Sequence, residues 1–280
     1  MILVANADDA GVDLPRGRGI LRAAREGIVR SASVLVGFPA AAAFVAAARE
    51  VEGLGLGLHL NLSEGRPLGP GGPSLVGEDG RFPGKRELWR RALSGRLDPA
   101  EVSQEVEAQW RALESLGVRP THLDGHNHVH LLPCVRDALV HAVPERTWIR
   151  CPTPAPPDAA LPEDPFDGGE ALAQALAVLA RDAVAAALGP FRRPRRFAGV
   201  RLAPGYRAAD LAARLLGLAA EVEDDEVVEF MVHPGEPCGG STPFSASEDR
   251  AREVEALTSE EVAAAVRGAR IRLASFGHLA

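Results

Sequence analysis

The stretch Ile2-Leu3-Val4-Ala5-Asn6-Ala7-Asp8-Asp9 opens the chain with a mostly apolar run that ends in two acids. Residues 2–7 lack the polar–apolar alternation of a strand with one solvated face, which predicts a strand buried on both faces. Such strands belong to parallel sheets that helices cover on both sides. Asp8 and Asp9 then follow the end of this strand. Because adjacent strand residues point to opposite sides, we expect the two carboxylates to take distinct roles.

Short apolar strands and amphipathic helices alternate along the rest of the chain. We predict strands at 33–36, 54–62, 121–124, 147–150, 197–200, 227–232 and 271–275, and helices at 16–29, 39–51, 85–93, 99–116, 133–142, 170–188, 208–218 and 259–267. This order predicts one α/β domain over residues 1–280 with a mainly parallel sheet. A barrel related to the (β/α)8 architecture is our first choice, and an open doubly wound sheet is the second.

Two long loops rich in glycine and proline, 63–84 and 152–167, exceed the usual length of a connection. We expect both to lie over the active-site face, and we expect loop 63–84 to close over a substrate. No G-x-G-x-x-G follows the first strand and no P-loop is present, which argues against a bound dinucleotide or nucleoside triphosphate.

The composition narrows the class of partner. The 280 residues carry 31 basic and 38 acidic side chains and a formal net charge of −7, which provides no field to attract nucleic acid. No apolar run approaches the roughly 20 residues that a membrane span needs, and the N-terminus lacks the basic region of a signal peptide. The three cysteines are odd in number and lack metal-type spacing, as expected for free thiols in a reducing compartment. We therefore expect a cytoplasmic protein.

Histidines and acids gather where the predicted strands end. Asp8 and Asp9 follow the first strand, His59 lies near the end of the strand at 54–62, and His233 follows the strand at 227–232. In a parallel sheet these ends share one face, so the side chains are expected to converge. Taken singly, each has a plain structural explanation: the acids could cap a turn, His59 could be a hydrogen-bonded core residue, and His233 could cap its turn.

The segment 121–130, Thr-His-Leu-Asp-Gly-His-Asn-His-Val-His, is more specific. It holds four histidines and Asp124, a dense run of metal-ligand residue types. A helical H-E-x-x-H site is excluded, because no glutamate is present and Gly125 interrupts the run. At His233, Pro234 and Gly235 end the strand, and we expect the imidazole to be exposed at the rim, where it could donate a proton to an amine leaving group.

The stretches 6–9, 57–68, 121–132 and 233–235, with weaker similarity at 149–152 and 250–257, together resemble the YdjC-like carbohydrate deacetylases, whose better-known members deacetylate chitooligosaccharides. The similarity spans nearly the whole chain in the same order. The chain departs from the family at Ala10, where an aromatic residue usually follows the two aspartates, and the smaller side chain bears on the fit of the substrate.

The resemblance implies a distorted (β/α) TIM-like barrel, a divalent cation and often a dimer, so a homodimer is an expectation. It implies that Asp9, His59 and His126 bind the metal. Asp8 would then be the catalytic base and His233 the acid. Further candidates, for substrate contact, are His128 and Arg150, while His122 and His130 would support the site or face the substrate.

The expected activity is that of a metal-dependent hydrolase that removes the acetyl group from an N-acetylated sugar, a chitooligosaccharide or a related amino sugar, with metal-activated water. The family is associated with Mg²⁺, whereas the ligand types also suit Zn²⁺, and the sequence leaves both open. One alternative is a two-histidine, one-carboxylate metal oxygenase, which would favour a β-rich fold. Another is a non-catalytic metal- or sugar-binding protein on the same scaffold, which would need neither Asp8 nor His233.

Overall fold

The computed structural model describes residues 1–151, 188–189, 191–199, 206–238 and 248–279. Within these residues eight strands form one sheet in the order β5-β4-β3-β2-β1-β7-β6, with β8 attached beside β1. Every pairing between strands is parallel, which confirms the predicted α/β class. The strands are β1 (Ile2–Ala10), β2 (Val29–Val34), β3 (Gly55–Leu60), β4 (His122–Gly125), β5 (Trp148–Ile149), β6 (Arg196–Ala198), β7 (Val227–Val232) and β8 (Arg272–Leu273).

The sheet curls into a distorted barrel. At one end of the strand order, the Ile149 N–H in β5 donates to the carbonyl of Arg192 at 2.8 Å, and the Arg192 N–H donates to the carbonyl of Thr147 at 3.2 Å. Arg192 lies shortly before β6, which is the other end of the order. The two ends of the sheet therefore approach each other, as expected for the barrel and not for the open doubly wound sheet.

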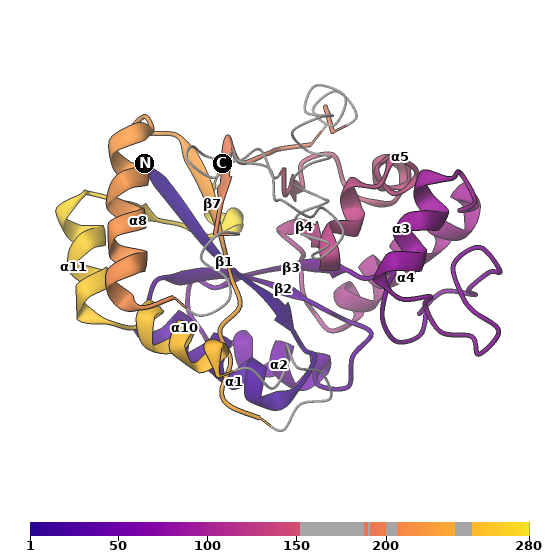
Figure 1. Ribbon diagram of the computed structural model, residues 1–280, viewed down its shortest axis with the longest axis horizontal. Helices are drawn as coiled ribbons and strands as arrows, with labels where there is room; N and C mark the ends of the chain where they lie inside the picture. The colour runs from indigo at the N-terminus through magenta and orange to yellow at the C-terminus, as the bar shows by residue number, and fades with distance from the viewer. Residues whose placement is uncertain (152–187, 190, 200–205, 239–247, 280) are drawn as a thin grey trace.

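Helices surround the strands (Figure 1), with α8 and α11 together at one side, α1, α2 and α10 along the next, and α3, α4 and α5 opposite α8. The helices are α1 (Leu14–Glu26), α2 (Ala41–Ala48), α3 (Lys85–Leu93), α4 (Pro99–Ser115), α5 (Pro133–Ala142), α8 (Ala208–Glu221), α10 (Asp249–Leu257) and α11 (Glu260–Gly268), with 3₁₀ turns η1 (His126–Leu131) and η3 (Phe276–His278). Asp98 caps α4 as predicted, because its side chain accepts a hydrogen bond from the Ala100 N–H at 2.8 Å. None of the described helices combines the length and apolar character that crossing a bilayer requires.

The two faces of β1 meet different surroundings. Leu3, Ala5 and Ala7 belong to the main apolar cluster, which the surrounding helices complete. On the other face Ile2 and Val4 belong to a small second cluster. This arrangement confirms that β1 is buried on both faces, because every one of its residues is buried.

The second face of β1 changes from apolar to polar along the strand. After Ile2 and Val4 come Asn6 and Asp8, which are 0% and 2% exposed and therefore depend on partners within the protein. The partners of Asn6 come from β2 and β4, since its side-chain amide donates to Ser33 at 2.8 Å and to Asp124 at 3.1 Å. The carboxyl end of the barrel therefore encloses a polar interior.

The predicted and observed elements differ most at the end of the first helix, at the start of β2 and at α10. The helix predicted over 16–29 ends at Glu26, because Gly27 caps it with an N–H bond to Ala23 at 3.1 Å. The chain then enters β2 at Val29, earlier than the predicted strand at 33–36. Helix α10 had no predicted counterpart. The predicted loop 152–167 and the predicted helix 170–188, up to residue 187, lie outside the described residues.

Loop 63–84 is fastened at several points. The Gly84 N–H donates to Ser63 at 3.1 Å and the Phe82 N–H donates to Gly65 at 3.0 Å, which ties the two ends of the loop together. Leu75 at its centre is fully buried. The loop is therefore packed against the rest of the protein, and whether it moves over a substrate stays a prediction.

Candidate metal centre and its buried ion-pair network

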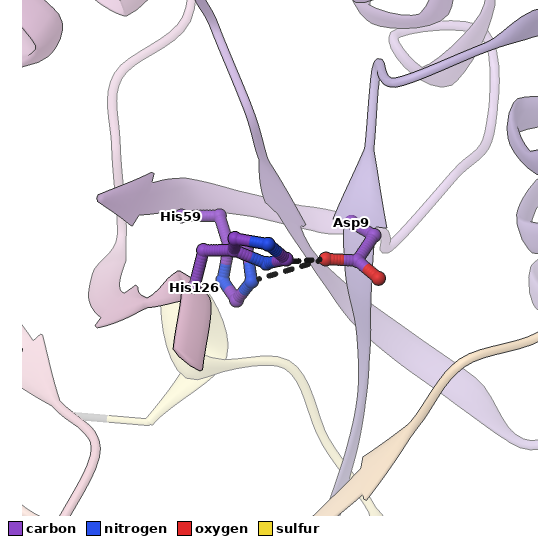
Figure 2. Close-up of side chains that lie close together, drawn as sticks. All are labelled: Asp9, His59 and His126. Carbon is purple, nitrogen blue, oxygen red and sulfur yellow. Dashed lines mark hydrogen bonds and ion pairs between the residues drawn. The ribbon is translucent and has the colours of Figure 1, made fainter. Parts of the chain in front are cut away.

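Three side chains from separate segments of the chain converge at the carboxyl end of the barrel. Asp9 comes from the end of β1, His59 from β3, and His126 from the start of η1, directly after β4. The Oδ1 atom of Asp9 lies 3.0 Å from Nδ1 of His126 and 3.3 Å from Nε2 of His59 (Figure 2). One potential ligand atom from each residue lies within 4.8 Å of the others, which is a geometry that could hold a metal ion.

Backbone strain is concentrated at this site. Among the described residues, four residues other than glycine have a positive φ, and three of them, Asp9 (62°), Asn127 (53°) and His128 (54°), lie on the segments that form the site. Each such residue costs about 1–3 kcal/mol and persists only where the surrounding structure imposes it. Strain of this kind is frequent at functional sites.

The positive φ of Asp9 also corrects one expectation. Asp8 and Asp9 do not point to opposite sides of a regular strand, since each has a carboxylate oxygen within 4.8 Å of a ring nitrogen of His59. The register of β1 with β2 shifts between Ala7 and Ala10, so the regular alternation ends before the two acids. Both carboxylates can therefore act on the same side of the barrel.

Asp124 connects the candidate metal ligands to the interior of the barrel. Its Oδ1 faces Nδ1 of His59 at 2.6 Å. The other oxygen accepts a hydrogen bond from Ser33 at 2.8 Å and pairs with Arg150 at 2.7 Å. With Asn6 as a fourth donor, at 3.1 Å, the carboxylate of Asp124 is fully engaged. Because Nδ1 of His59 is held by Asp124, Nε2 is the nitrogen that faces Asp9.

Arg150 is the centre of a buried network of ion pairs. Its guanidinium makes a two-pronged contact with Asp8, at 2.6 and 2.7 Å, and its Nε donates to Glu229 at 2.8 Å. The Arg150 side chain is 1% exposed and also pairs with Asp124. One guanidinium thus joins three carboxylates from β1, β4 and β7. A buried charge needs such partners, because its removal from water is costly.

Burial and these pairs shift the protonation equilibria of the acids. Burial raises the pKa of Asp8, against the opposing charge of Arg150. Burial would also raise the pKa of Asp9, but hydrogen bonds from His126 and His59 hold it well below its usual value. Burial raises the pKa of Glu229 to about 7. Asp8 is therefore a better proton acceptor than an ordinary aspartate, whereas Asp9 stays ionised.

The pKa values of the two imidazoles in the site are raised, whereas those of the histidines around it are lowered. Burial lowers the pKa of His59, but the charges of Asp124 and Asp8 outweigh it and raise the value to about 10. Burial likewise opposes the hydrogen bonds of His126 with Asp9 and Glu64, which raise its pKa to about 9. At neutral pH the metal-free protein therefore has a proton on both nitrogens of each ring, and a cation would have to displace one of them.

The remaining histidines of segment 121–130 are buried and neutral. Burial lowers the pKa of His122 and of His130 to about 3, and that of His128 to well below its usual value. His122 bonds Ser33 at 3.1 Å, and His130 donates to the Arg150 carbonyl at 3.1 Å. His122 and His130 are thus structural neighbours of the network. Both ring nitrogens of His128 lack a hydrogen-bond partner in the described part of the chain.

His233 directly follows β7, at the level of Asp8 in the neighbouring strand β1. The register of β1 with β7 pairs Ala7 with Val232, so Asp8 and His233 follow at the same level of adjacent strands. The expectation of an exposed imidazole was wrong, because His233 is 5% exposed. The segment that follows it packs on α1, where a Cβ built on Gly19 would lie only 2.4 Å from Gly235.

Some site residues had no predicted role. The sequence marked Asp124 only as one member of the histidine-rich segment 121–130. Glu229 is an acid within the apolar strand 227–232, and such a buried acid could have indicated a polar partner inside the barrel. Arg16 pairs with Oδ2 of Asp9 at 3.2 Å, and Glu64 lies 3.2 Å from Nε2 of His126. Ala10 is fully buried in the main apolar cluster.

The sequence is similar to a known protein family and to named deacetylases. The sequence model of the YdjC-like protein family matches residues 2–268. A carbohydrate deacetylase from Homo sapiens is 36% identical over 286 residues, which cover 92% of this chain and 85% of the human protein. A chitooligosaccharide deacetylase from Serratia marcescens is 41% identical over 133 residues, which cover 47% of this chain and 51% of that protein.

Solved structures share the architecture. A protein from Enterococcus faecalis, described as a candidate cellobiose-phosphate cleavage protein, has a TM-score of 0.73 and 25% identity, with 99% of this chain and 98% of that chain covered. A lactam utilization protein from Thermus thermophilus, at 19% identity and a TM-score of 0.51, shares the fold alone.

Proposed function

The chain belongs to the YdjC-like protein family, and from this membership and its site we propose that it is a metal-dependent hydrolase that removes the acetyl group from an N-acetylated sugar. The observation that carries the proposal is the convergence of Asp9, His59 and His126 on one point at the carboxyl end of the barrel. The relatives named as carbohydrate and chitooligosaccharide deacetylases support an acetylated chitooligosaccharide, or a related amino sugar, as the substrate class.

The three side chains fit a divalent cation. One carboxylate oxygen and two imidazole nitrogens form a donor set that leaves positions open for water and a substrate oxygen. Both imidazoles also have a carboxylate at the nitrogen that faces away from Asp9, which is the usual support of ligating histidines. We propose Mg²⁺ as the native ion with Zn²⁺ as the alternative. When bound, such an ion supplies water of lowered pKa and polarises the amide carbonyl.

Asp8 is the proposed catalytic base. Its carboxylate is held from one side by Arg150 and Asn6, so its position is fixed before a substrate arrives. Burial raises its pKa, which makes it a stronger proton acceptor toward the attacking water.

His233 is the proposed acid that protonates the departing sugar amine. Its backbone is fixed at both ends, because its N–H donates to Glu253 at 2.7 Å and its carbonyl accepts from Arg250 at 2.8 Å. It follows a strand adjacent to that of Asp8, so the two groups would act from neighbouring positions on the rim of the barrel.

The two residues expected to contact the substrate differ in their surroundings. His128 is buried and strained, and both of its ring nitrogens lack partners among the described residues, which supports a hydrogen bond to substrate. Arg150 has its guanidinium engaged by three carboxylates. We therefore assign Arg150 to holding Asp8 rather than to direct substrate contact.

The rival functions have less support. The double-stranded β-helix that would favour a metal oxygenase differs from a parallel α/β barrel. A non-catalytic metal- or sugar-binding protein would gain nothing from a buried base held by an arginine, since that ion-pair network is costly to assemble.

The test is acetate release by the purified protein, supplied with Mg²⁺ or Zn²⁺, from N-acetylglucosamine and from N-acetylated chitooligosaccharides. Asp8→Asn keeps the shape of the base and removes its proton-accepting power, so turnover should fall by about 10²–10⁴-fold while the cation is retained. His126→Ala should lose both turnover and the cation.

Two results would contradict the proposal. Ordinary activity of Asp8→Asn would remove the base from the mechanism. A wild-type protein that releases no acetate from any of these sugars with either ion would exclude the deacetylase itself.

A further inference from the structure

A carboxylate at the mouth of the site contacts one candidate metal ligand. Oε1 of Glu64 lies 3.2 Å from Nε2 of His126. The Glu64 side chain is 51% exposed and that of His126 is 15% exposed, so this pair lies where the site opens to solvent. Glu64 is the second residue of loop 63–84.

The two nitrogens of His126 face different acids. Nδ1 lies 3.0 Å from Oδ1 of Asp9, and Asp9, His59 and His126 are the residues that could hold a cation together. Nε2, on the opposite side of the ring, lies 3.2 Å from Oε1 of Glu64. If Nδ1 binds the ion, the proton of the neutral imidazole is on Nε2 and can be donated to Glu64.

His59 has the same arrangement with its nitrogens exchanged. Its Nε2 faces Oδ1 of Asp9 at 3.3 Å, and its Nδ1 is held by Asp124 at 2.6 Å. The five side chains form a chain in which each imidazole lies between Asp9 and a second carboxylate, in the order Asp124, His59, Asp9, His126 and Glu64. One end of this chain is buried and the other is at the mouth.

We propose that Glu64 is a positioning residue that fixes the tautomer and ring orientation of His126, so that Nδ1 is the nitrogen presented to the cation. The inference rests on the proposed metal site. A carboxylate that holds the second nitrogen of a ligating histidine typically raises metal affinity by about 10- to 100-fold.

The backbone around Glu64 is fixed well enough for this role. The side-chain oxygen of Asn61 accepts from the N–H groups of Ser63 and Glu64, both at 3.0 Å, and its amide donates to the Glu64 carbonyl at 2.7 Å. The backbone of Asn61 is in turn bonded on both sides by Gln109 of α4, at 3.0 and 2.6 Å. Glu64 therefore projects from an anchored turn, although its side chain is half exposed.

The anchoring continues further along the loop. The carboxylate of Glu105, one helical turn before Gln109 in α4, accepts from the N–H groups of Leu68 and Gly69 at 3.0 and 2.7 Å. Gln109 donates to the same carboxylate at 2.7 Å. Substitution of the Glu64 side chain leaves all of these contacts in place, so it changes the His126 contact without releasing the loop.

The test measures the dissociation constant for Zn²⁺ alone by calorimetry in wild type, Glu64→Ala, Glu64→Gln and Glu78→Ala. Glu64→Ala should weaken binding by about 10-fold, whereas Glu64→Gln keeps an acceptor oxygen and should recover most of the affinity. Glu78 is exposed on the same loop, so Glu78→Ala removes an equal charge away from His126 and should bind as wild type does. Thermal unfolding of the metal-free variants controls for folding.

Nitrogen-15 NMR of the Zn²⁺-bound wild type supplies an independent readout. His126 should show a protonated Nε2 and an Nδ1 without a proton. Equal Zn²⁺ affinity of Glu64→Ala and Glu78→Ala, or a proton on Nδ1 of His126, would overturn the inference and leave the proposed function intact. A wild type whose Zn²⁺ affinity is unchanged by His126→Ala would overturn both.

Discussion

Substitution of Asp124 by asparagine should damage stability and cation binding together. The carboxylate of Asp124 receives four interactions inside the barrel, from His59 at 2.6 Å, Arg150 at 2.7 Å, Ser33 at 2.8 Å and Asn6 at 3.1 Å. Asparagine has nearly the same shape, but one of its oxygens is replaced by an NH₂ donor. That group would face donors from its neighbours, so at least one pair of buried polar groups would be mismatched.

The magnitude follows from the network. Breaking a buried ion pair by removing one partner costs about 3–5 kcal/mol. Arg150 keeps its contacts with Asp8 and Glu229 in the variant, so we expect the low end, about 3 kcal/mol. His59 would also lose the carboxylate that fixes its tautomer, which should weaken cation binding by about 10- to 100-fold.

Two measurements separate these effects. Urea unfolding of the metal-free protein gives the loss of stability, and calorimetry with Zn²⁺ gives the loss of affinity. Ser33→Ala is the matched control, because it removes a neighbour of Asp124 without changing a charge or touching His59. It should cost about 1–3 kcal/mol, since His122 and Asn6 lose a partner, and it should bind Zn²⁺ as wild type does.

The outcome that refutes this reasoning is specific. If Asp124→Asn binds Zn²⁺ as tightly as Ser33→Ala, the contact between Asp124 and His59 does not support the candidate ligand. If its unfolding free energy also stays within about 1 kcal/mol of wild type, buried pairs in this barrel are worth far less than the usual cost of breaking one.

The remaining predictions concern pH and packing. The pKa values of His59 and His126 are raised to about 10 and about 9 in the metal-free protein, so the stability they contribute is present below about pH 6.5 and is lost as the pH rises through those values. Urea unfolding in the presence of a chelator should therefore show that stability falls as the pH rises through these values. Zn²⁺ affinity should rise over the same pH interval, because the cation then displaces fewer protons. If neither stability nor Zn²⁺ affinity changes with pH, the pKa shifts are contradicted. Gly19→Ala would force a Cβ within 2.4 Å of the Gly235 backbone, so it should lower the stability of the protein by about 1–3 kcal/mol. Because Gly235 follows His233 by two residues, the variant should also release acetate more slowly, with little change in Zn²⁺ affinity. Unchanged turnover would show that the position of His233 does not depend on this contact.

The convergence of the site could be predicted because it needs only the parallel order of the strands. Once the strands at 2–7, 54–62 and 121–124 are parallel, their carboxyl ends lie at the same end of the sheet. Asp9, His59 and His126 lie near or just beyond those ends, so they must come together there. Neither the contact distances nor the curvature of the sheet enters this argument. The family resemblance then selected His126 from four neighbouring histidines, a choice that spacing alone could not make.

The network around Arg150 could not be predicted in the same way. It depends on which strands face one another across a curled sheet, and the closure through Arg192 brings β5 toward β6 and β7. A pattern read along the chain contains no information about contacts across the barrel. Arg150 and Glu229 come together only through this curvature.

Asp9 shows the limit of local reasoning most clearly. The alternation of side chains in a strand predicts that two adjacent acids diverge, yet a positive φ turns Asp9 toward the histidines. Aspartate adopts the left-handed backbone region only occasionally, so its presence at position 9 does not predict a positive φ. The surrounding contacts with His126, His59 and Arg16 impose it.

The polar interior is itself an argument for function. On the inner face of β1, Ile2 and Val4 pack in an apolar cluster, so this barrel accommodates apolar filling at one level. At the next level it carries Asn6 and Asp8 instead; Asn6 donates to Asp8, and Arg150 is the buried counter-charge of Asp8. Replacing such buried ion pairs by apolar residues is often neutral or stabilising, so stability does not explain their presence. Fixed orientation of the proposed base Asp8 and of the proposed metal ligand His59 would explain it, because one guanidinium contacts both Asp8 and Asp124, the aspartate that holds His59.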